Sequence, residues 1–203
     1  MTVPLQLILF IDAQNTYRGA RESFFNSTGP SVNGQFSPAK LGKLIEARGG
    51  PNGAICALSE IRMYTGRPEP DKDPKTYAAH MKQCAAWQKD GVTVIHRVLR
   101  YPPGWPNQRA QEKGIDTALA IDFVAMAVDG AYDIGIIMST DTDLLPALEF
   151  TYNRYAGIHH VAVAAWRSSH SNRRLSIPGS NIWCHWLHRA DYDAVADLTD
   201  YNR

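Results

Sequence analysis

Short runs of consecutive apolar residues alternate along this chain with longer segments in which apolar residues recur at helical spacing. The short runs are rich in β-branched residues and are typical of strands that are buried on both faces of a sheet. The predicted strands cover residues 5–11, 61–65, 92–99, 134–138 and 160–166. The predicted helices cover residues 38–48, 75–90 and 115–128, and a further helix begins near Leu144.

The order of these elements predicts the fold class. Strands that alternate with helices form a parallel sheet with right-handed crossovers, and the helices then cover both faces of that sheet. We therefore predict an α/β fold, a three-layer α/β/α sandwich around a mostly parallel sheet with a strand order of about 3-2-1-4-5. Helix 115–128 is expected to be largely buried, because apolar residues surround it almost completely. Residues 16–37 look like a long polar connection, and residues 182–198 fit either a strand or a helix.

Composition indicates one globular unit. The 203 residues are 44% hydrophobic and 20% charged, which is ordinary for a chain with a sizeable core. We expect a single domain over residues 1–203, with a core of about 5–166 and a C-terminal extension of about 167–203. No apolar run approaches the roughly 20 residues of a membrane span. The three cysteines are odd in number and far apart, which favours a reducing, cytoplasmic location and argues against structural zinc.

The charge pattern suggests a binding surface in one loop only. The net charge of +1 gives no global basic signal for nucleic acid and weakens a simple binding-module reading. The loop after residue 99, however, places Tyr101 and Trp105 among Arg100, Arg109 and Lys113. Aromatic rings between cations suit a single-stranded nucleic acid. A proline-rich loop pinned by one buried tryptophan is at least as good an explanation of these residues.

Acidic residues fall at the predicted carboxyl ends of the strands. Asp12 follows the first strand, Asp116 begins the helix after the third, and Asp141 and Asp143 follow the fourth. Each alone could be an ordinary helix cap, but all four face the same edge of a parallel sheet. Converging carboxylates repel one another unless cations neutralise them. An all-oxygen ligand set selects Mg²⁺ or Mn²⁺, and such metals are suited to phosphodiester hydrolysis.

Other phosphate and hydrolase chemistries lack their motifs. The sequence has no G-x-x-x-x-G-K-[ST] loop, no G-x-G-x-x-G after a strand, no G-x-S-x-G and no H-E-x-x-H. A covalent aspartyl-phosphate site would need a second acid two residues after Asp12, and Gln14 occupies that place.

Three sequence blocks carry a family resemblance. They read F-I-D-A-Q-N at residues 10–15, E-K-G-I-D-T-A-L-A-I-D at 112–122 and Y-D-I-G-I-I-M-S-T-D-T-D-L-L-P at 132–146. In this order they resemble the NYN family, which comprises PIN-like, metal-dependent ribonucleases and includes the LabA-like group. The resemblance implies a PIN-like sandwich and endonucleolytic cleavage of RNA with Mg²⁺ or Mn²⁺, leaving 5′-phosphate ends.

The resemblance also assigns roles to individual residues. It carries the metal-binding role onto Asp12, Asp116, Asp141 and Asp143. Asn15 matches an asparagine expected to orient a carboxylate or contact substrate. Supporting roles around the metal site fall to Asp122, which matches a helix acid of the family, and to Ser139 and Thr140. Thr140 stands where the family commonly has glycine.

The sequence therefore predicts a hydrolase, a metal-dependent endoribonuclease that acts on single-stranded or structured RNA. Candidate phosphate-binding residues lie in loops at the same edge of the sheet: Arg18, Arg21, Arg109 and Lys113. The alternatives are a catalytically weak RNA-binding or regulatory module, or a metal-dependent phosphoesterase acting on DNA or nucleotides. No membrane partner is expected, and a homodimer is open, since PIN-like domains often dimerise.

Overall fold

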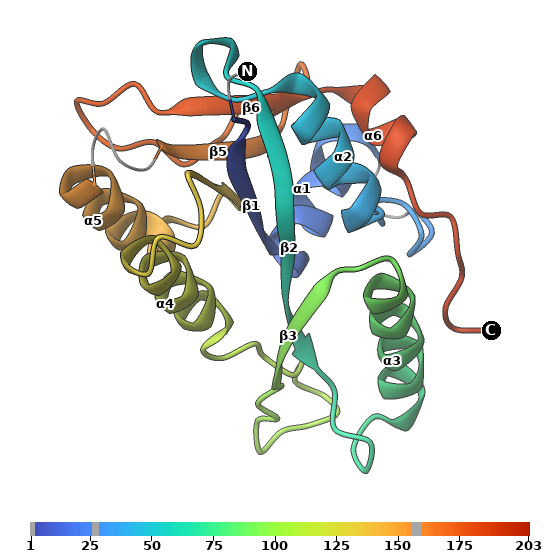
Figure 1. The fold of residues 1–203 in the computed structure, drawn as a ribbon. Helices are drawn as coiled ribbons and strands as arrows, with labels where there is room; N and C mark the ends of the chain where they lie inside the picture. The colour runs from blue at the N-terminus through green and yellow to red at the C-terminus, as the bar shows by residue number, and fades with distance from the viewer. Residues whose placement is uncertain (1–2, 26–28, 156–159) are drawn as a thin grey trace.

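A six-stranded parallel sheet forms the centre of the protein, in a computed structural model that describes residues 3–25, 29–155 and 160–203 (Figure 1). The strand order is β3-β2-β1-β4-β5-β6, and every neighbouring pair is parallel. The bounds are β1 (Leu5–Asp12), β2 (Cys56–Arg67), β3 (Thr93–Val98), β4 (Ile134–Met138), β5 (His160–Trp166) and β6 (Trp183–Leu187). The predicted order of five strands is confirmed, and the C-terminal segment adds a sixth.

Helices cover both faces of the sheet. They are α1 (Ala13–Phe24), α2 (Pro38–Arg48), α3 (Pro74–Lys89), α4 (Ile115–Val128), α5 (Leu145–Tyr155) and α6 (Arg189–Val195), with two short 3₁₀ turns, η1 (Pro51–Gly53) and η2 (Thr142–Leu144). Figure 1 shows α4 and α5 together on one side and the other helices on the opposite side. The predicted α/β/α sandwich is confirmed.

The two faces of β1 build two separate cores. Leu7, Leu9 and Ile11 pack with residues of α1, α2 and α3, whereas Ile8 and Phe10 pack with residues of α4 and α5. This alternation follows from the two-residue period of a strand, which points successive side chains to opposite faces. Because both faces are buried, β1 reads as a continuous apolar run. Its carboxyl end is therefore held firmly from both sides.

The connection predicted over residues 16–37 is wrong in its first part, since α1 occupies Ala13–Phe24. The buried side of α1 consists of Ala13, Thr16, Ala20 and Ser23. These side chains are small or polar, so the apolar periodicity that marks a helix is missing from the sequence. Asp12 caps the helix by accepting a hydrogen bond from the Asn15 backbone N–H.

The ambiguous segment 182–198 contains both a strand and a helix. The change occurs at His188, whose backbone N–H donates to the Asp191 carboxylate in a capping box. Asp191 also pairs with Arg48 at 2.5 Å, which ties α6 to α2.

Helix α4 is less buried than its composition indicates. One stripe of apolar residues faces the core, at Ile115, Leu119, Phe123 and Ala127. Ile121 and Val128 lie on the opposite side and are 59% and 55% exposed. The expectation of a largely buried helix is therefore wrong for its outer face. Within the described ranges, no helix has the length and apolar character needed to cross a membrane.

Candidate active site

The carboxyl ends of β1 and β4 meet at the centre of the sheet, where Ile11 pairs with Met138. Asp12 lies directly after this pair and is only 4% exposed. Its Oδ1 accepts the Asn15 backbone N–H at 3.0 Å, and its Oδ2 accepts the Ser139 hydroxyl at 3.1 Å. The Asp12 carboxylate is therefore fixed between the start of α1 and the end of β4.

Hydrogen bonds join the β1–α1 junction to the β4–η2 junction a second time. The Asn15 amide oxygen accepts the Thr140 backbone N–H at 2.9 Å and the Thr140 hydroxyl at 3.1 Å. The Ser139 hydroxyl oxygen accepts the Asp141 backbone N–H at 3.1 Å, and the Asp141 carboxylate accepts the Asp143 backbone N–H at 3.0 Å. Ser139 thus bridges Asp12 and Asp141, as a supporting residue would.

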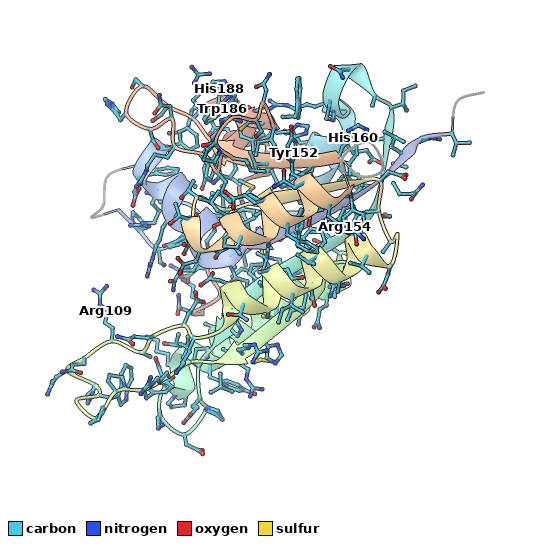
Figure 2. The ribbon with its side chains drawn as sticks, turned by 90° about the vertical axis from the view of Figure 1, so that its left-hand side faces the viewer. Arg109, Tyr152, Arg154, His160, Trp186 and His188 are labelled. Atoms are coloured by element: carbon cyan, nitrogen blue, oxygen red, sulfur yellow. The ribbon has the colours of Figure 1, made fainter. Side chains whose placement is uncertain are left out.

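A cavity of about 390 Å³ opens at this point, and acidic and basic side chains both line it. Its charged lining residues are Asp12, Arg18, Arg109, Glu112, Asp116 and Asp141. Three of the four predicted metal ligands therefore share one cavity with two of the four predicted phosphate-binding residues. Figure 2 shows Arg109 on the loop that precedes α4.

Burial and mutual repulsion raise the pKa values of the acids in this cavity. Burial, followed by the charges of Asp116 and Glu112, raises the pKa of Asp12 to about 7, against the opposing effect of its two hydrogen bonds. The pKa of Asp116 is raised by burial and then by the charges of Asp141 and Asp143. The full set of negative charges is thus unfavourable without a cation.

The donor chemistry of this cavity fits a hydrated Mg²⁺ or Mn²⁺ ion. All its acidic ligands are oxygen donors, which these ions prefer. Within residues 3–25, 29–155 and 160–203, no three His, Cys, Asp or Glu side chains form a ready-made metal cluster. Mg²⁺ commonly keeps several waters and binds proteins through only one or two carboxylates, so the open arrangement of Asp12, Asp116 and Asp141 is compatible with it.

Comparison with known proteins shows the family. A family model for the NYN domain matches residues 6–175. The chain belongs to the NYN family. Proteins of this family are generally nuclease-like and typically use divalent metals, and the PIN-like fold expected from the sequence is confirmed.

A solved structure shares the fold of this NYN domain. It is the crystal structure of a protein of unknown function from Vibrio parahaemolyticus, with a TM-score of 0.52 and 17% sequence identity. The similarity covers 81% of this chain and 84% of that chain. The comparison of this chain with curated proteins found no match.

Asp122 does not lie at the acidic cavity of this NYN domain. Its carboxylate accepts hydrogen bonds from the Arg62 guanidinium and the Tyr64 hydroxyl, both at 2.8 Å, and Arg62 also pairs with Glu60 at 2.6 Å. The partners of Asp122 are therefore on β2. The structure thus places Asp122 against β2 and outside the lining of the acidic cavity, because a helix position alone does not reveal which strand lies beneath it.

We expect Asp122→Ala to lower stability without changing the chemistry of the acidic cavity. Loss of the carboxylate leaves the Tyr64 O–H and the Arg62 Nη2 without their acceptor, although the Tyr64 oxygen still accepts from Arg62 Nε, so the free energy of unfolding should fall by about 1–2 kcal/mol. Urea unfolding measures this loss. RNA cleavage per folded molecule should stay at the wild-type level. A large fall in cleavage would show that Asp122 does contribute to the active site.

Arg21 and Lys113, two of the predicted phosphate-binding residues, also lie outside the acidic cavity. The Arg21 guanidinium donates to the carbonyl oxygens of Gly29, Pro30 and Asn33 at 2.7–2.9 Å. It therefore anchors the segment that follows α1 and does not line the acidic cavity. Lys113 is exposed and also lies outside the lining of this cavity. Asp143 is exposed as well, and it acts on the site through its charge near Asp116.

Glu112 is the acidic residue that the sequence reading missed. It lines the cavity, and its Oε1 accepts the Gly66 backbone N–H at 2.8 Å. The pKa of Glu112 is raised by burial and by the charge of Asp116, and Arg18 opposes this rise. The sequence contains one signal for Glu112, since this residue begins the second motif block. Its position before the helix, however, does not indicate that its side chain reaches the end of β2.

Proposed function

We propose that this NYN domain is a metal-dependent endoribonuclease that hydrolyses RNA phosphodiester bonds and leaves 5′-phosphate ends. One observation carries the proposal. Asp12, Asp116 and Asp141 come from three elements that are far apart in sequence, and they line one cavity together with Arg18 and Arg109. A cavity for a structural role would not combine repelling carboxylates with exposed guanidinium groups, whereas a cation and a phosphate satisfy both.

The charge of each side chain in the cavity indicates its role. Asp12, Asp116 and Asp141 would hold Mg²⁺ or Mn²⁺, which supplies an activated water and neutralises developing charge on phosphate oxygens. Arg18 and Arg109 bind and orient the phosphate. Asn15 acts indirectly. Its amide oxygen accepts two hydrogen bonds from Thr140, and these bonds position the loop that carries Asp141.

End-labelled single-stranded RNA tests this function directly. The protein is incubated with Mg²⁺, with Mn²⁺ or with EDTA, and the ends of the products are analysed. We expect cleavage only with metal, internal cut sites, and 5′-phosphate ends that a ligase accepts. Cleavage that persists in EDTA, or products with 2′,3′-cyclic phosphate ends, would contradict the proposal, since the latter come from attack by the RNA's own 2′-hydroxyl.

Arg109→Ala should raise the KM for RNA by roughly three- to tenfold, because one exposed phosphate contact is lost. The salt dependence of binding should become shallower by about one unit of log Kd against log salt. The matched control is Arg100→Ala, which removes the same charge from the same loop at an exposed position outside the cavity. Equal effects of the two variants would show that general charge, and not the cavity, attracts RNA.

A second candidate function is RNA binding without efficient cleavage. The raised pKa of Asp12, about 7, favours it, because a carboxyl that retains its proton near neutral pH is a weaker metal ligand. The same assay separates the two functions. RNA that binds at wild-type affinity but stays intact with every metal would support the binding module.

A further inference from the structure

A second cavity of about 330 Å³ adjoins the acidic one. It lies between α1, the end of β2 and α3, and Gln14 and Glu112 line both cavities. Its volume falls at the lower end of the range for small-molecule pockets. A chain whose phosphate occupies the acidic cavity would therefore have room for a neighbouring group in this second cavity.

The lining of the second cavity differs in character from the acidic one. Aromatic rings come from Tyr17, Phe36 and Trp87, and amide side chains come from Gln14, Gln35 and Gln83. Glu112 is the one acidic residue of this lining, and its Oε1 accepts the Gly66 backbone N–H. His80 also lines the cavity; burial, with the charges of His96 and Arg67, lowers its pKa to about 4, so the ring is neutral. This surface suits a flat, uncharged, hydrogen-bonding group and offers no cation for a phosphate.

Two polar atoms of the residues in this lining are buried without a hydrogen-bond partner in the described part of the chain. The Gln35 Oε1 is buried, and so is the indole Nε1 of Trp87, a residue that is only 7% exposed. Neither atom has a hydrogen-bond partner among the described residues. Buried polar groups are nearly always paired, so such exceptions require an explanation. One of these atoms is an acceptor and the other a donor. Both are shielded from solvent, so a ligand in the cavity would pair with them only after the Gln35 and Trp87 side chains rotate toward it.

We propose that the second cavity binds one unstacked nucleobase of the RNA, next to the phosphate held in the acidic cavity. The choice of RNA as the ligand rests on the proposed function, whereas the cavity's chemistry independently indicates a heteroaromatic base. Bases that leave the stack are recognised by aromatic side chains and by hydrogen bonds to their edges. Substrates would therefore be single-stranded or locally unpaired at the cut site, because a paired base cannot enter.

Binding of free nucleosides tests the site without metal and without cleavage. The full chain in EDTA is titrated with adenosine, cytidine or uridine, and ribose serves as the base-free control. NMR follows the indole N–H signals, and Trp87→Phe identifies the signal of Trp87. We expect at least one nucleoside to shift this signal in a saturable way and ribose to leave it unchanged. Equal responses to nucleosides and ribose, or no response to any of them, overturn the proposal.

Glutamine substitutions test the hydrogen bonds. Gln35→Leu should weaken nucleoside binding by about fivefold, yet leave the melting temperature unchanged or higher, because the Gln35 Oε1 has no partner to lose among the described residues. Gln83→Leu should also weaken binding, while Gln88→Leu, at an exposed position of the same helix, should not. Unchanged affinity in both cavity variants overturns the base site. Cleavage of RNA without nucleoside binding would overturn the base site but not the nuclease function. Nucleoside binding without RNA cleavage would support the base site and overturn the nuclease function.

Discussion

Asp116→Asn is expected to reduce metal-dependent RNA cleavage by at least about 10²–10³-fold, the usual cost of removing one well-placed electrostatic group from an active site. Asparagine keeps the size of the side chain and one oxygen donor, but it removes the negative charge. Asp116 lies in the first turn of α4, and the charges of Asp141 and Asp143 act on it. It is thus the residue through which α4 contributes to the acidic cavity.

The matched control for this variant is Asp129→Asn. Asp129 is exposed at the opposite end of α4 and lies outside the acidic cavity. Single-turnover cleavage of end-labelled RNA measures the chemical step, and anisotropy of labelled RNA measures binding. We expect Asp129→Asn to cleave normally and Asp116→Asn to bind RNA without cleaving it. Equal cleavage by the wild type and Asp116→Asn would indicate a contaminating nuclease or a different active site.

Asp12→Asn is expected to stabilise the metal-free protein at alkaline pH by about 1–3 kcal/mol, while abolishing cleavage. The sign follows from the pKa of Asp12, which is about 7 in the folded protein against an ordinary value of 3.8. Below about pH 4 the carboxyl is protonated in both states and has no effect. As the pH rises to 7, the folded state retains the proton more strongly, so stability falls. Above pH 7 the full penalty applies, and asparagine removes it while still capping α1.

Urea unfolding in EDTA at pH 5 and pH 8 measures this effect. The gain from Asp12→Asn should be small at pH 5 and large at pH 8. Added Mg²⁺ should stabilise the wild type at pH 8 and have much less effect on the variant. Asp73→Asn is the control, because Asp73 caps α3 through the Thr76 N–H in the same way but lies outside the acidic cavity. A loss of stability at pH 8 in Asp12→Asn alone would show that the hydrogen bonds of this carboxylate outweigh its burial.

The sequence predicts the parts of the site that depend on local order along the chain. Asp12, Asp116 and Asp141 each sit at the end of a strand or the start of a helix, and parallel topology brings such positions to one edge. Asp122 shows the limit of this reasoning. Its place on α4 is evident from the sequence, but its partners Arg62 and Tyr64 on β2 are a property of tertiary packing.

The second cavity could not be predicted from the sequence for a similar reason. Its lining comes from α1, the segment near Gln35, the end of β2 and α3, so no contiguous motif marks it. Helix α1 was itself hidden, because Ala20 and Ser23 on its buried side carry no apolar signal. Arg21 shows the same limit, because carbonyl oxygens of the segment that follows α1 accept hydrogen bonds from its guanidinium.

The position of β6 has a consequence for self-association. The NYN match ends at residue 175, whereas β6 begins at Trp183 and pairs with β5 from Ala162 to Trp166. Without β6, the β5 backbone would present an open row of donors and acceptors to other chains, which is a common start of aggregation. With β6 in place, the outermost strand on this side of the sheet is only five residues long, and the Arg167 guanidinium lies over the Trp186 ring at 5.2 Å. The segment beyond the family signature thus covers the edge of β5, and β3 forms the opposite edge of the sheet.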